Sequence, residues 1–169
     1  MFCYQCEQTT RSRRGDGCAN AVGTCGKDAV TADLQDLLIH LCKGVSMYAH
    51  RAAELGARDR DVDVFVIESL FTTLTNVNFD PGRFEALIDR ATGVRQRARA
   101  CYESACAKAG RAPQVLAGPA GCDPGHALDQ LLAKAKDGAI TVGLDRDGAD
   151  VVGLRALVLY GIKGAAAYF

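Results

Sequence analysis

The sequence lacks any bias in charge, since lysine plus arginine and aspartate plus glutamate each number 20 and the formal net charge is +0. This balance excludes the basic composition expected of a nucleic-acid-binding protein and the polybasic composition of a membrane-surface protein. Long hydrophobic runs are also missing, because the longest uncharged stretches, such as residues 69–79, fall far short of the roughly 20 apolar residues of a membrane span. The first residues lead directly into polar sequence without a secretory signal. We therefore expect a cytoplasmic protein with neither nucleic-acid nor membrane partners.

The sequence is rich in hydrophobic residues and in cysteine. Hydrophobic residues make up 49% of the 169 residues, which is enough for a domain of ordinary size with its own core. Eight cysteines in a chain without a secretory signal indicate thiols that bind metal or stay free. Four of them lie within the first 25 residues and four are scattered, namely Cys3, Cys6, Cys18 and Cys25, then Cys42, Cys101, Cys106 and Cys122.

Apolar residues recur at helical spacing from about residue 31 onward and predict an all-α fold. We expect helices that begin at Thr31, Asp61, Asp80-Pro81, Asp123-Pro124 and Ala149, with at most a short extended piece at residues 140–142. Short connections favour antiparallel packing of these helices in a bundle. The predicted organisation is an irregular Cys-rich loop over residues 1–30, followed by a helical bundle domain over residues 31–169.

One pattern occurs twice in the chain. Leu-x2-Leu-x5-Lys-Gly-x3-Tyr begins at Leu34 and again at Leu154. We interpret the two copies as similar helices in equivalent places of two bundle halves, with chance convergence of amphipathic helices as the alternative. The second copy runs to Phe169 without a glycine cap, a proline or a basic last turn. We therefore expect a bundle cut short at its C-terminal end, with a frayed terminus as the alternative.

The first four cysteines form the motif Cys3-x2-Cys6-x11-Cys18-x6-Cys25. Four thiolates in one short loop can converge on a single metal centre, and the glycines between them let backbone N–H groups approach sulfur. Structural zinc prefers two pairs of closely spaced ligands, and the x6 spacing suits it poorly. Iron–sulfur clusters tolerate irregular spacing and need four thiolates. An iron–sulfur cluster is therefore the favoured interpretation, with structural zinc and free or disulfide-bonded cysteines as alternatives.

Other residues receive lesser roles. Arg11, Arg13, Arg14 and Lys27 lie in the same segment, where they either offset the negative charge of a cluster or are ordinary solvated charges. Cys42 falls on an apolar helix face and is expected to be a buried thiol. Cys122 precedes a predicted helix N-terminus and is a candidate for a reactive thiol with a lowered pKa.

These motifs resemble the N-terminus of the hybrid cluster proteins, also called prismane proteins or hydroxylamine reductases. The matching segments lie in the family's order and span nearly the whole chain: residues 1–9 (MFCYQCEQT), 23–27 (GTCGK), 34–38 (LQDLL), 73–80 (TLTNVNFD) and 159–168 (LYGIKGAAAY). The x2, x11, x6 cysteine spacing is similar to that of the family's branch from facultative anaerobes.

The resemblance implies that Cys3, Cys6, Cys18 and Cys25 bind the proximal cluster, a [4Fe–4S] or [2Fe–2S] centre, and that the helices form a domain of two three-helix bundles. Family members reduce hydroxylamine to ammonia and nitric oxide to nitrous oxide in nitrosative-stress defence, with electrons from an NADH-dependent flavin and iron–sulfur reductase. Their substrate binds at a hybrid iron–sulfur–oxygen cluster whose ligands lie in later domains and cannot be mapped onto these residues. We therefore expect electron relay without hydroxylamine turnover from this chain alone. The alternative is a standalone iron–sulfur electron-transfer or sensor protein.

Overall fold

The computed structural model describes residues 3–6, 18 and 22–169 and is all-α over these residues, as predicted. Its helices are α1 (Ala29–Glu54), α2 (Arg60–Thr72), α3 (Pro81–Lys108), α4 (Leu128–Ala135), α5 (Leu144–Asp147) and α6 (Ala149–Ala166), with 3₁₀ turns η1 (Gly118–Gly121) and η2 (Lys136–Gly138). Within the described residues, β pairing is limited to one isolated bridge between Val22 and Asp28.

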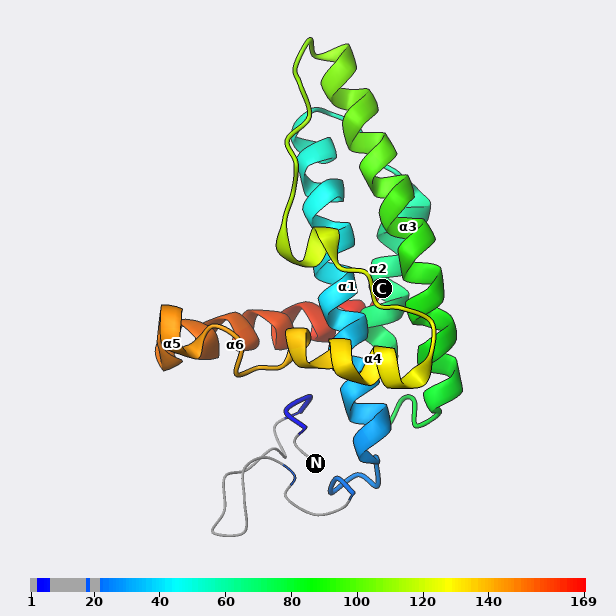
Figure 1. Ribbon diagram of the computed structural model, residues 1–169, viewed down its shortest axis with the longest axis vertical. Coiled ribbons are helices and arrows are strands. Elements are labelled where there is room, and N and C mark those ends of the chain that lie inside the picture. Colours follow the sequence, from blue (N-terminus) through cyan, green and yellow to red (C-terminus); the bar gives the residue numbers. More distant parts are fainter. Residues whose placement is uncertain (1–2, 7–17, 19–21) are drawn as a thin grey trace.

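The long helices α1, α2 and α3 form an up-down-up bundle (Figure 1). Their apolar faces meet in a core whose large side chains are 0–1% exposed, among them Leu34, Leu37, Leu41, Phe65, Phe84 and Ile88. Burying each such side chain contributes roughly 1.5–3 kcal/mol. The three long helices therefore share a core built from their own side chains.

The helix starts follow local hydrogen bonding and differ in part from the predicted ones. The side chain of Asp28 accepts from the N–H of Thr31 at 2.7 Å, so α1 begins before the predicted cap at Thr31. The α2 helix likewise starts early, because Asp59 is its cap. The predicted start of α3 is confirmed, with Asp80 as the cap and proline in the first helical position.

The second Asp-Pro pair does not start a helix, so this prediction is wrong. The side chain of Asp123 accepts from the N–H of Gly125 at 3.1 Å, and α4 begins only at Leu128. Gln130 Oε1 takes the place of the cap by accepting from the N–H groups of His126 and Ala127 at 3.0 and 3.2 Å. Residues 140–143 form turns rather than an extended piece.

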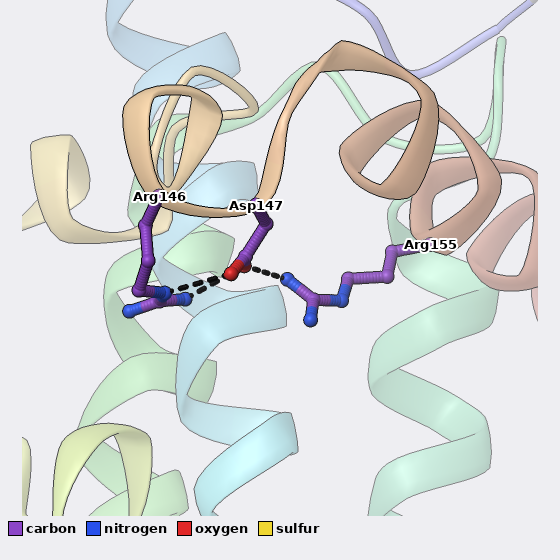
Figure 2. Close-up of polar contacts among 3 residues, drawn as sticks. All are labelled: Arg146, Asp147 and Arg155. Carbon is purple, nitrogen blue, oxygen red and sulfur yellow. Dashed lines mark hydrogen bonds and ion pairs between the residues drawn. The ribbon is translucent and has the colours of Figure 1, made fainter.

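The last helix, α6, lies across the bundle and packs against α2 (Figure 1). Asp147 joins α5 to α6, because its carboxylate accepts from the guanidinium of Arg146 at 2.8 Å and from that of Arg155 (Figure 2). These bonds hold the pKa of Asp147 well below its usual range. One side of α6 remains uncovered, since Leu154 and Leu157 are 62% and 64% exposed. None of the helices in the described part of the chain has the length and apolarity needed to span a membrane.

Candidate metal centre

The described segment that carries Cys3 and Cys6 and the segment that leads into α1 lie on the same side of the bundle (Figure 1). Cys3 and Cys6 share one turn, Cys25 lies just before α1, and the position of Cys18 is also described. Cys3 is buried and the other three are half-buried. The predicted contributions of Arg11, Arg13 and Arg14 lie outside the described residues.

Lys27 connects these thiols electrostatically. Its side chain is only 2% exposed and interacts with Cys3, Cys6 and Cys25, while Cys3 interacts in turn with Cys18. Burial lowers the pKa of Lys27, and the neighbouring thiols oppose that shift. The Lys27 ammonium also lies 5.4 Å from the centre of the Phe79 ring. Lys27 is therefore a buried member of the site and not a solvated surface charge.

A tight turn brings the backbone close to two of the thiols. The N–H of Gly23 donates to the carbonyl of Lys27 at 2.7 Å. A Cβ atom at Gly23 would lie in van der Waals contact with the site, 3.5 Å from Cys25 Sγ and 3.9 Å from Cys18 Cβ. The turn thus places the main chain of Gly23 close to the sulfur of Cys25.

The donor set fits an iron–sulfur cluster. Burial raises the pKa of Cys3, and a hydrogen bond from the Gln5 backbone opposes this effect. A thiolate at such a position needs a compensating positive charge, which iron would supply. Among the described residues, no group of three or more His, Cys, Asp or Glu side chains lies close enough together to hold one metal ion. A [4Fe–4S] cluster sets a different requirement, because its four thiolates bind four separate irons and need not converge on one ion.

Sequence reasoning missed a second polar group beside these cysteines. Gln5, in the turn between Cys3 and Cys6, donates through Nε2 to Asp36 Oδ1 and accepts at Oε1 from Lys163 Nζ. Burial raises the pKa of Asp36 to about 7 and lowers that of Lys163 to about 8. The only available signals were the position of Gln5 inside the Cys-x2-Cys turn and the repeated Lys-Gly pair.

The scattered cysteines do not join this site. Cys42 is 3% exposed in the core, and burial raises its pKa to about 12, in line with the prediction of a buried thiol. Cys122, which the sequence marks only as a candidate for a reactive thiol, does not have the lowered pKa that this role needs. Its thiol is buried, burial raises its pKa, and α4 begins only at Leu128, too far along the chain to activate it.

Comparison with known proteins gives a match along the whole chain. Residues 1–169 match the Prismane/CO dehydrogenase family. Proteins named hydroxylamine reductase from Acidithiobacillus ferrooxidans and Burkholderia ambifaria are each 53% identical to this chain over 168 residues, and one from Rhodospirillum rubrum is 46% identical over 168 residues. Each alignment covers 99% of this chain, and the chain spans 30% of the length of each relative.

Proposed function

Because the chain belongs to the Prismane/CO dehydrogenase family, we propose that it acts as the N-terminal, electron-relaying part of a hydroxylamine reductase of the hybrid cluster type. In this proposal Cys3, Cys6, Cys18 and Cys25 hold an iron–sulfur cluster, [4Fe–4S] or [2Fe–2S], which supplies one-electron transfer when bound. The observation that supports the proposal is that buried Lys27 interacts with Cys3, Cys6 and Cys25, while Cys3 interacts with Cys18.

The protein residues around the thiols have separable roles. Burial of Cys3 keeps water from its sulfur, and the Lys27 ammonium offsets the negative charge of the thiolates. A buried cation near sulfur also favours the state that carries one more electron. Gly23 lets the main chain pass close to Cys25 and Cys18 without a side chain in between.

The exposed face of α6 supports a role within a larger protein. Leu154, Leu157 and Val158 are each more than 60% exposed and lie on one helix. Exposed apolar surface of this kind is typical of an interface, and the relatives are several times longer than this chain. We place further domains of the reductase, with the hybrid cluster and the site for small nitrogen-oxide substrates, against this face. An NADH-dependent flavin and iron–sulfur reductase in the cytoplasm is the proposed electron donor.

Anaerobic reconstitution with ferrous iron and sulfide tests the proposal. We expect a coloured protein that contains iron and inorganic sulfide and gives an EPR signal on reduction. Cys18→Ser should lose the cluster, whereas the matched control Cys101→Ser, which changes a half-buried thiol outside the site, should keep it. A colourless protein that binds about one zinc would refute the cluster, and hydroxylamine turnover by this chain alone would refute a role limited to relay.

A further inference from the structure

The turn that carries Cys3 and Cys6 is attached to a helix from the far end of the sequence. Both residues between these cysteines are bound by α6: the hydroxyl of Tyr160 donates to the carbonyl of Tyr4, and Lys163 Nζ donates to Gln5 Oε1. More than 150 residues separate the partners in each pair. The position of the turn therefore depends on the packing of α6 against the bundle.

Both polar atoms of the Gln5 side-chain amide are hydrogen-bonded. Its oxygen accepts from Lys163 on α6, and its nitrogen donates to Asp36 on α1. All three side chains are buried, with exposed fractions of 5% for Gln5, 8% for Asp36 and 1% for Lys163. Because a buried amide between a cation and a carboxyl group has a single favourable orientation, these contacts fix the turn in position as well as in orientation.

Lys163 also brings charge to the cysteines. Its ammonium interacts electrostatically with Cys3 and Cys6, and it donates a further hydrogen bond to the carbonyl of Thr73 at 3.3 Å. Burial lowers the pKa of Lys163 to about 8, and the neighbouring Asp36 opposes that shift. Lys27 and Lys163 are thus two buried cations that act on the same turn.

We propose that Lys163 and Tyr160 are positioning residues for the cysteine site: together they hold the Cys3–Cys6 turn on α6, and the Lys163 charge raises the reduction potential of the centre bound there. The anchoring follows from contacts within this chain, whereas the effect on the potential rests on the proposed function. Two measurements therefore test the two parts separately.

Alkylation of the metal-free chain tests the anchoring. Mass spectrometry would follow the rate at which iodoacetamide modifies Cys3 and Cys6, relative to Cys18 in the same molecule. In Lys163→Met we expect this relative rate to rise roughly tenfold or more, because a charge-assisted hydrogen bond holding the turn is lost. The control Lys108→Met, at the end of α3 farthest from the loop (Figure 1), should show the wild-type rate.

A milder variant covers the case in which Lys163→Met does not fold. Tyr160→Phe removes only a hydroxyl from a half-buried ring and should give a smaller rise in the same relative rate. If Lys163→Met folds and its relative alkylation rates are unchanged, the anchoring is overturned. If Lys163→Met does not fold, unchanged relative rates in Tyr160→Phe overturn it.

The midpoint potential of the reconstituted chain tests the role of the charge. We expect Lys163→Met to have a more negative potential than the wild type, Gln5→Ala to shift it less because the Lys163 charge remains, and Lys108→Met to leave it unchanged. An unchanged potential in Lys163→Met would overturn this part. If the wild-type chain takes up no iron and sulfide, the proposed function fails, while the alkylation rates still decide whether α6 anchors the turn.

Discussion

The contact between α1 and η1 predicts a large effect from a very small substitution. Gly44 lies in the middle of α1, where the main chain of η1 crosses it. A Cβ atom at Gly44 would fall 2.2 Å from the carbonyl oxygen of Pro119, 2.6 Å from its carbonyl carbon and 3.1 Å from the nitrogen of Ala120. Because all three atoms belong to the backbone, Gly44→Ala must displace η1 from α1.

Two opposing effects set the magnitude. Overpacking of a close contact costs about 1–3 kcal/mol, and a clash with backbone at 2.2 Å belongs at the upper end of that range. The higher helix propensity of alanine stabilises a helix interior by about 1 kcal/mol relative to glycine. We therefore expect Gly44→Ala to lower the free energy of unfolding by about 2 kcal/mol, which for a domain of this size lowers Tm by roughly 4–8 °C.

Gly93 in α3 supplies the control, because a Cβ at this position would meet no atom within 4 Å beyond the neighbouring backbone of its own helix. Gly93→Ala gains helix propensity without a clash and should raise stability by up to about 1 kcal/mol. Thermal and urea unfolding, followed by circular dichroism on both variants in the same metal state, measures the two effects. A Gly44→Ala variant as stable as Gly93→Ala would show that η1 does not press against α1 as described.

Three further predictions concern the site and α6. Cys18→Ser should leave the far-UV circular dichroism spectrum nearly unchanged while it abolishes iron binding, because the core cluster of the described residues contains none of the four predicted ligands. Burial raises the pKa of Asp36 from 3.8 to about 7, so the unfolded chain loses this proton at a lower pH than the folded chain. The free energy of unfolding should therefore fall as pH rises from about 4 to 7. Urea titrations across this range should show that Asp36→Asn removes up to about 4 kcal/mol of the fall. A Cβ atom at Gly164 would lie in open space, so Gly164→Ala should stabilise this chain slightly. In a full-length reductase the same substitution should lower Tm, because Gly44, the equivalent glycine of the repeat, makes a close backbone contact.

The two Asp-Pro-Gly segments show where sequence patterns stop being informative. In both, the aspartate side chain accepts from the N–H of the glycine two residues later, at 2.9 Å for Asp80 and 3.1 Å for Asp123. Gly125 has a φ of +76°, a left-handed conformation that turns the chain away from a helix. Glycine allows either outcome. After Asp123, Gln130 accepts from the N–H groups of His126 and Ala127 and would lie 2.6 Å from a Cβ at Gly125. That local contact involves residues outside the tripeptide and cannot be read from it.

The resemblance to hybrid cluster proteins is confirmed by the family match, and the ligand set Cys3, Cys6, Cys18 and Cys25 remains a prediction based on spacing. Spacing could identify these residues because ligands in one loop must be close in sequence. It could not identify Lys163 or Asp36, which reach the site through tertiary packing alone. A buried lysine leaves no signature of its own, since Lys43, which holds the equivalent place in the first copy of the repeat, is exposed.

The repeat gives a physical reason for this difference. In α1 the repeated leucines are buried, with Leu34 and Leu37 at 0% exposure, whereas their counterparts Leu154 and Leu157 are 62% and 64% exposed. The two copies therefore bury different helix faces. The α1 helix packs through the face that carries its repeated leucines, and α6 packs through the face that carries Lys163. Burying the polar face of α6 costs free energy unless it finds partners, and the turn between Cys3 and Cys6 supplies them through Gln5 and Tyr4. The leucine face of α6 is then left for other partners, so one helix connects the cysteine site to whatever covers that face.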